Sequence, residues 1–248
     1  MFGMALMAVL MSVSLTSCSK DENQDGSEDF SNEKKLVKII EDDSEEVYRY
    51  DDMGRVIEIL YNGEISASYV WSDDVVKEIY GTNIKEYTLA NSRIQGYESN
   101  SGTYGSYTYD SYGKLLIFNS DYWNERYVWT GDKVTSVTHD IDRSDYEPAK
   151  TNITYDKSCK KGYFPMFMYM VSREVLDISW AHPELFGLRS SLLPSTITYS
   201  SKDHNEFSTF TYEFDKDGYI SKFTWINERS GSSIVTSTDT RTYTLIWE

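Results

Sequence analysis

The sequence predicts an all-β fold, in which an antiparallel meander of repeated hairpins curls into a barrel or half-barrel. One pattern carries this prediction: aromatic, any residue, aromatic, Asp, two residues, Gly, one residue, aliphatic. It occurs three times, at residues 48–56, 107–115 and 212–220. The composition agrees, because 21 Tyr and only 4 Pro in 248 residues favour strands.

The spacing of this pattern has a physical cause. Asp favours the first position of a type I turn, where its carboxylate accepts hydrogen bonds from the backbone that follows. The Gly takes a left-handed conformation, from which a second strand leaves with the correct twist. The two aromatic residues before the Asp are two positions apart and therefore share one face of the first strand. Each copy thus predicts a strand, a turn and a second strand with one aromatic face.

A second unit alternates with the first. It reads Tyr-Val-Trp at residues 69–71 and again at 127–129, and in the second copy Gly131-Asp132 suits a two-residue hairpin loop. The repeat near 20 residues predicts about ten to fourteen strands. A meander of that length has to curl or close to protect its edges. Polar residues opposite the aromatic face favour a barrel wall in contact with water rather than lipid.

The strand pattern stops between Pro165 and Pro194. Apolar residues, including the run from Met166 to Val171, recur there at helical spacing. The sequence therefore predicts a short helical insert near 166–190, broken at His182-Pro183, that packs on the sheet or fills its interior.

The first 35 residues divide into two segments before a single β-barrel-like domain at 36–248. Residues 1–17 resemble a lipoprotein signal peptide, although no Lys or Arg precedes the apolar run. Leu15-Thr16-Ser17-Cys18 resembles a bacterial lipobox, which implies lipidation of Cys18 and attachment to a membrane. Residues 18–35 are acidic and polar, as expected of a disordered tether. Asp21, Asn23 and Asp25 also match the start of a calcium-binding loop, but no acidic residue stands at the twelfth position.

The start of this tether, from Cys18 to Glu22, resembles the export signal of Bacteroides-type surface lipoproteins. Together with the repeated hairpins, the acidic tether and the apolar insert, it makes nearly the whole chain similar to Bacteroides-type lipoproteins of unknown function with a porin-like fold. The resemblance implies an outer-membrane, lipid-anchored protein that faces the cell exterior, and it brings no catalytic residues. The hairpin units alone also resemble the Tyr-Asp repeats of Rhs-type proteins.

Few residues suggest chemistry. The three His are far apart, and we find no zinc motif, no nucleophile elbow and no phosphate-binding loop, so we predict no catalytic residue, no metal site, no cofactor and no enzyme. A net charge of -16 argues against nucleic acid as a partner. Cys159 is expected to be an unpaired thiol. The aromatic face is the feature that most suggests binding, and Trp71, Tyr109 and Trp129 are the candidate ligand-binding residues. The alternative role for these rings is cross-strand packing.

The function predicted from these observations is a monomeric, surface-exposed, lipid-anchored protein that binds an extracellular glycan or peptide. Two alternatives stay open. One is a structural or accessory subunit of an outer-membrane complex. The other is a hydrolase with a carboxylate pair that the sequence does not single out.

Overall fold

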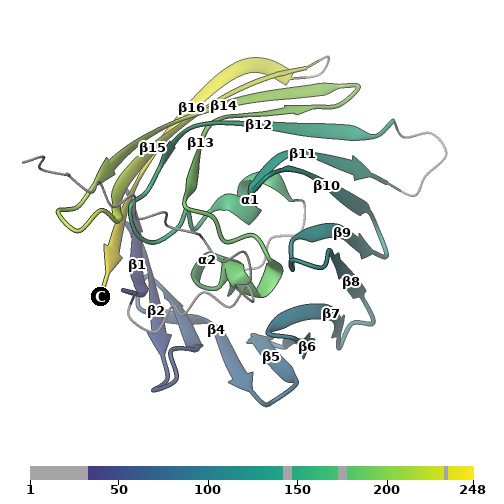
Figure 1. Cartoon of the computed structure of the whole chain (residues 1–248), viewed down its shortest axis with the longest axis vertical. Helices are drawn as coiled ribbons and strands as arrows, with labels where there is room; N and C mark the ends of the chain where they lie inside the picture. Colours follow the sequence, from purple (N-terminus) through teal and green to yellow (C-terminus); the bar gives the residue numbers. More distant parts are fainter. Residues whose placement is uncertain (1–32, 142–146, 173–177, 232–233) are drawn as a thin grey trace, which may run out of the picture. The chain divides into compact units, whose positions relative to one another are not determined.

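A computed structural model describes residues 33–141, 147–172, 178–231 and 234–248 (Figure 1). Cys18, the predicted signal peptide and most of the predicted tether lie outside these residues. The described residues form sixteen strands, two short α-helices and one 3-10 helix. The predicted all-β barrel with a short helical insert is therefore confirmed.

The strands, in chain order, are β1 (Leu36–Glu41), β2 (Ser44–Tyr50), β3 (Val56–Tyr61), β4 (Glu64–Trp71), β5 (Val75–Tyr80), β6 (Asn83–Ala90), β7 (Arg93–Ser99), β8 (Tyr104–Tyr109), β9 (Leu115–Ser120), β10 (Asn124–Thr130), β11 (Lys133–Asp140), β12 (Ala149–Ser158), β13 (Leu192–Ser200), β14 (His204–Phe214), β15 (Ile220–Gly231) and β16 (Ile234–Trp247). Each strand pairs antiparallel with its neighbours in sequence, and β1 pairs with β16 to close the barrel. Every strand in the described part of the chain therefore has two partners.

An antiparallel meander places successive turns at alternate ends of the barrel. Lys35 and Glu248 exchange backbone hydrogen bonds, so both ends of the barrel domain lie together. We call this end the termini end. It also carries the turns at 51–55, 110–114 and 215–219. The opposite end, which carries the β1–β2 and β3–β4 turns, is called the mouth.

The three predicted Asp-Gly turns form as expected. Gly54, Gly113 and Gly218 have φ of 81°, 75° and 94°, the left-handed conformation that such a turn requires. In the first copy, the Asp51 carboxylate accepts hydrogen bonds from the backbone N–H of Met53 and Arg55, both at 2.9 Å. Asp110 and Asp215 make the same pair of bonds. The side chain of each Asp thus fixes the turn that reverses the chain.

The strands outnumber the ten to fourteen expected because some turns carry weak sequence signals. Asn91 and Ser92, with φ of 52° and 57°, connect β6 to β7 in a two-residue reversal without any Gly. The third Asp-Gly unit also departs from the pattern. Its second aromatic residue, Phe214, lies at the end of β14 and is 41% exposed.

The insert between β12 and β13 consists of α1 (Phe167–Val171), α2 (Ile178–Ala181) and the 3-10 helix η1 (Pro183–Phe186). The break at His182-Pro183 is where the sequence predicts it. Figure 1 shows α1 and α2 within the ring of strands. Buried insert residues such as Met166, Phe167 and Phe186 belong to the same apolar core as the inward-facing residues of the wall. The insert therefore fills the interior of the barrel.

The outer wall carries charged side chains. Two cross-strand ion pairs lie on this outer face, Arg49–Glu58 and Lys77–Glu86, with N–O distances of 2.8 and 2.6 Å. None of the helices in the described ranges is long and apolar enough to cross a membrane.

Candidate functional site

The inner wall changes from apolar to polar toward the mouth. Inward-facing tyrosines mark the boundary, because their hydroxyls donate hydrogen bonds to carboxylates. Tyr69 and Tyr87 both donate to Glu78, and Tyr127 donates to Glu125, each at 2.7 Å. Burial and the neighbouring Glu78 raise the pKa of Tyr87 well above its usual range, so this hydroxyl keeps its proton and stays a donor.

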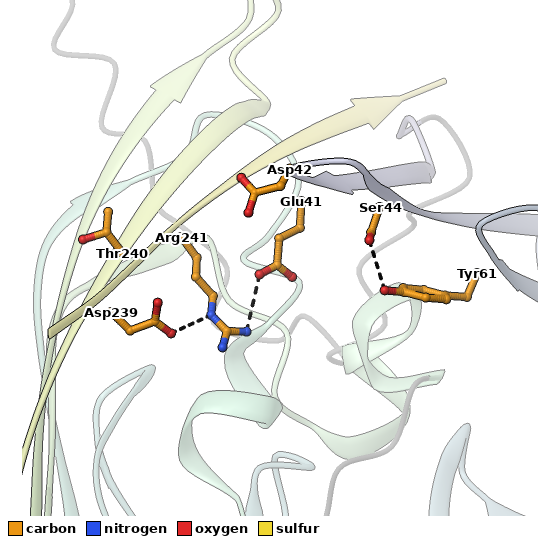
Figure 2. Close-up of a pocket in the computed structure, with 7 residues that line it drawn as sticks. All are labelled: Glu41, Asp42, Ser44, Tyr61, Asp239, Thr240 and Arg241. Atoms are coloured by element: carbon orange, nitrogen blue, oxygen red, sulfur yellow. Dashed lines mark hydrogen bonds and ion pairs between the residues drawn. The ribbon is translucent and has the colours of Figure 1, made fainter. Parts of the chain in front are cut away.

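At the mouth, residues of strands β16, β1, β2 and β3 line an open cleft of about 440 Å³ (Figure 2). It is lined by polar side chains: Glu41, Asp42, Ser44, Tyr61, Asp239, Thr240 and Arg241. We call it the mouth cleft. A polar cleft of this size can hold a small polar ligand such as one or two sugar rings.

Arg241 organises the mouth cleft. Its Nε lies 2.8 Å from Asp239 Oδ2, and one of its terminal nitrogens lies 3.4 Å from Glu41 Oε1 (Figure 2). The guanidinium also lies 5.6 Å from the centre of the Trp225 ring, within range of a cation–π contact. Hydrogen bonds to Asp239 and Tyr243 raise the pKa of Arg241 further above its usual range. One fixed cation between two carboxylates presents both donors and acceptors to a ligand.

Exposed tyrosines gather at the mouth. Tyr61 and Tyr80 end β3 and β5, Tyr104 begins β8, and Tyr122 lies in the β9–β10 turn. Their exposed fractions lie between 51% and 60%. Tyr61 also lines the mouth cleft and donates a hydrogen bond of 3.1 Å to Ser44. Of these tyrosines, Tyr61 is the one that lines the mouth cleft, and the others stand further along the rim.

A second polar group, deeper in the barrel, joins three neighbouring strands. His139 Nε2 lies 2.8 Å from Thr151 Oγ1, and His139 Nδ1 lies 3.1 Å from Glu125 Oε1. Ser172, just after α1, donates to Glu125 at 2.7 Å. The order Thr–His–Glu is that of a nucleophile, a base and an orienting acid in a catalytic triad. However, the side chains of Thr151, His139 and Glu125 are only 2%, 5% and 0% exposed. A substrate does not reach them, and their visible role is to fix the insert to the wall.

The candidate ligand-binding residues Trp71, Tyr109 and Trp129 all face inward near the termini end. Each is half-buried and packs on the core. Their polar atoms donate to the carbonyl oxygens of Val56, Ile94 and Leu115, at 2.6, 2.6 and 2.7 Å. The structure brings them together only as members of a larger ring, and ligand binding by them stays a prediction.

We call this ring the aromatic girdle. An aromatic residue near the end of an even-numbered strand donates to a carbonyl near the start of the preceding odd-numbered strand. The donors are Tyr50, Trp71, Tyr109, Trp129, Tyr155, Tyr212 and Trp247. Strand β6 carries Leu89 at the equivalent place, opposite Ile94. The girdle explains why aromatic residues recur at these positions, which the sequence alone suggests without assigning a partner.

The two cysteines are the other residues for which the sequence makes a prediction. Cys18 lies outside the described residues, so lipidation stays a prediction. Cys159 is a buried free thiol. Within the described ranges, no group of three or more His, Cys, Asp or Glu side chains is arranged to hold a metal ion.

Sequence reasoning did not single out Glu41, Asp239 or Arg241. The alternation Asp239-Thr240-Arg241, just before the inward-facing Tyr243, was the available signal. It indicates that both charged residues share the inner face of the last strand. Glu41 joins them only because the barrel closes between β1 and β16.

Comparisons with known proteins bear on the fold. No protein-family model matches the chain, and no curated protein matches it. Among solved structures, the chain is similar to a porin-like protein from Bacteroides uniformis, with a TM-score of 0.65 and 14% sequence identity. The match covers 87% of this chain and 96% of that one. At this identity the likeness shows a shared porin-like barrel fold, and the predicted lipoprotein family stays a prediction.

Proposed function

We propose that this chain is a lipid-anchored, surface-exposed binding protein whose mouth cleft holds an extracellular glycan. The observation that carries the proposal is the mouth cleft itself, a polar hollow of about 440 Å³ whose lining includes the exposed ring of Tyr61. Carboxylates and a guanidinium pair with the hydroxyl groups of a sugar, and flat rings pack on its apolar face.

The closed barrel favours a glycan over a peptide. An extended peptide commonly binds by adding a strand to a free sheet edge, but each strand of the described barrel is paired on both sides. A helical peptide needs an apolar groove, whereas the mouth cleft is lined by charged and hydroxyl-bearing side chains.

We propose binding rather than hydrolysis. Glycosidases use two carboxylates with separate roles, one of them a proton donor. In the mouth cleft, Glu41 and Asp239 instead engage the same Arg241 guanidinium, so the two carboxylates act as one ion-paired unit.

The point at which the chain enters the barrel supports one orientation at the membrane. Lys35 lies at the termini end, and we propose that a chain anchored through a lipid on Cys18 presents the mouth to its ligand. The ion pairs on the outer wall support a barrel surrounded by water and held at the membrane by its lipid. On this proposal the mouth faces the cell exterior and its medium.

Two experiments test the proposal. In the first, the purified protein is screened on a glycan array. The affinity for each glycan that binds is then measured by calorimetry for the wild type and for the variants Glu41→Gln, Asp239→Asn and Arg241→Gln. We expect these variants to lose binding, while the control Lys77→Gln/Glu86→Gln on the outer wall binds as the wild type does. An array without hits, or cleft variants with unchanged affinity, contradicts the binding site.

The second experiment addresses the anchor. Cys18→Ala should abolish incorporation of radiolabelled palmitate and release the protein from membranes. Protease treatment of intact cells should cleave the wild-type protein if it faces outward. Membrane attachment that persists in Cys18→Ala contradicts the anchor without affecting the binding result.

A further inference from the structure

The insert meets the wall through His182, the residue before η1. The backbone nitrogen of Val56, at the start of β3, lies 3.1 Å from His182 Nε2. The other ring nitrogen, Nδ1, lies 2.7 Å from Glu184 Oε1. His182 therefore links the corner of the insert, residues 182–189, to the β2–β3 side of the barrel.

These contacts fix which nitrogen carries the proton. A backbone N–H can only donate, so Nε2 must be the unprotonated acceptor. The proton then sits on Nδ1 and is donated to the Glu184 carboxylate. The observed geometry requires the neutral form of His182.

The other two histidines of the chain differ in this respect. Both partners of His139, Glu125 and the Thr151 hydroxyl, can accept a hydrogen bond, so a second ring proton keeps both contacts. His204 Nε2 lies 2.5 Å from the Glu206 carboxylate, which also accepts. Only His182 has a ring nitrogen opposite a group that cannot accept.

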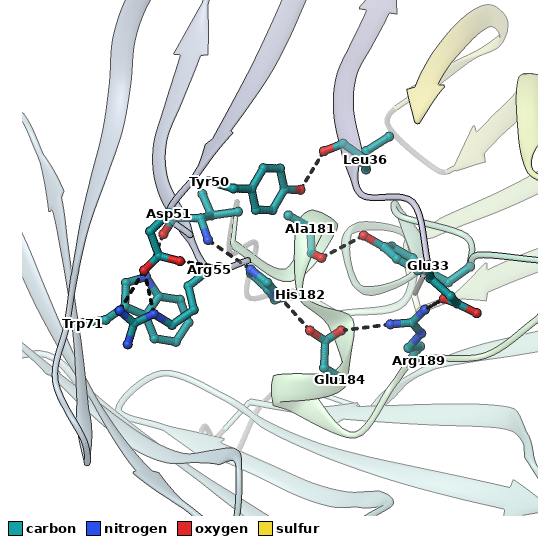
Figure 3. A network of polar contacts seen from close by, with 12 residues as sticks. Glu33, Leu36, Tyr50, Asp51, Arg55, Trp71, Ala181, His182, Glu184 and Arg189 are labelled. Atoms are coloured by element: carbon teal, nitrogen blue, oxygen red, sulfur yellow. Dashed lines mark hydrogen bonds and ion pairs between the residues drawn. The ribbon is translucent and has the colours of Figure 1, made fainter. Parts of the chain in front are cut away.

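Charged groups surround the His182 contact on both sides. On the insert side, Glu184 lies 3.9 Å from Arg189, which in turn pairs with Glu33 (Figure 3). Burial opposes ionisation of Glu184, but the hydrogen bond from His182 and the charge of Arg189 favour the carboxylate, and the pKa of Glu184 is lowered. Glu184 therefore remains an anion that holds a protonated His182 as well as a neutral one.

On the wall side, the turn after β2 contributes Asp51 and Arg55, which form an ion pair at 2.7 Å. The Arg55 guanidinium lies over the Trp71 ring. The rings of Tyr50 and Trp71 each make a T-shaped contact with the imidazole of His182, with ring centres 6.1 and 5.9 Å from the centre of the imidazole. The corner of the insert thus covers two members of the aromatic girdle.

We propose that protonation of His182 detaches the corner of the insert from the wall and uncovers Tyr50 and Trp71. A proton on Nε2 would face the N–H of Val56, and two donors repel each other. The bond to Glu184 survives, so His182 and Glu184 leave the wall together. Acidification is then a signal that opens the interior at the termini end.

NMR of the full-length protein tests this inference. The readout is the hydrogen-exchange protection factor of the Val56 amide, which corrects for the slower intrinsic exchange at low pH. Between about pH 7.5 and pH 5.5 we expect it to fall about tenfold or more, the change that corresponds to losing one net hydrogen bond. The indole N–H of Trp71, which donates to the Val56 carbonyl, should shift over the same range.

Two variants sharpen the result. His182→Gln offers an acceptor and a donor but does not titrate, so the Val56 protection factor should become independent of pH. The control His204→Gln should keep the wild-type pH dependence. A wild-type protection factor that does not change with pH overturns the inference, and so does a pH dependence that His204→Gln removes. The wild-type titration decides the matter even if His182→Gln does not fold.

Discussion

The aromatic girdle makes a quantitative prediction about stability. Replacing Tyr50, Tyr155 or Tyr212 by Phe keeps the ring and its packing but removes the hydroxyl. The carbonyl oxygens of Leu36, Val134 and Pro194 then lose donors at 2.6, 2.8 and 2.7 Å. Burial raises the pKa of all three hydroxyls, so each is a neutral donor at every physiological pH.

The expected cost follows from the net value of one hydrogen bond. Removing a donor from a largely buried carbonyl costs about 1–2 kcal/mol in the free energy of unfolding. For a domain of this size, 1 kcal/mol corresponds to about 2–4 °C in Tm. Each variant should therefore melt a few degrees below the wild type, as measured by calorimetry and by urea unfolding followed by circular dichroism.

The matched control is Tyr112→Phe, because Tyr112 lies in an Asp-Gly turn at the same end and is 80% exposed. We expect its Tm to be unchanged. If the three girdle variants melt with the wild type, the girdle hydrogen bonds do not stabilise the barrel and the reasoning is refuted.

Three further predictions concern other parts of the barrel. Leu89→Tyr supplies the donor that β6 lacks and should raise the free energy of unfolding by about 0.5–1 kcal/mol in urea titrations; a lower stability would show that the girdle does not extend to this strand. Asp51→Asn should destabilise the protein at neutral pH. Burial alone would raise the pKa of Asp51, but hydrogen bonds from Arg55 and Met53 and the charge of Arg55 lower it. Its stabilisation is therefore present above about pH 4 and lost as the pH falls through the lowered value, so acid titrations of the two proteins should converge. Finally, burial raises the pKa of the Cys159 thiol to about 11, so a thiol reagent should label the native protein slowly at pH near 8 and the urea-unfolded protein at once.

Local patterns were predictable from the sequence because their causes are local. The carboxylate of Asp51 bonds to backbone two and four residues later, and Gly54 takes its left-handed φ within the same turn. A hairpin whose reversal depends on five consecutive residues can be inferred from those residues alone. The break before Pro183 is local in the same sense, because Pro cannot continue the preceding helix.

The mouth cleft could not be predicted because closure creates it. Glu41 and Arg241 are about 200 residues apart and meet only when β1 pairs with β16. The girdle hydrogen bonds likewise join positions 14 to 27 residues apart, so the partner of Trp71 or Trp247 depends on the register between two neighbouring strands. The sequence suggested an aromatic face. The structure shows that the hydroxyl and indole N–H groups of the girdle residues donate to backbone carbonyl oxygens of the barrel.

The claim that the mouth is the binding end is tested most directly by hydrogen exchange with and without a glycan identified on the array. We predict slower exchange on binding in peptides that contain residues 41–44, 61 and 239–241, with no change in the turns at 51–55 and 110–114. Protection confined to those two turns, at the termini end, would contradict the account.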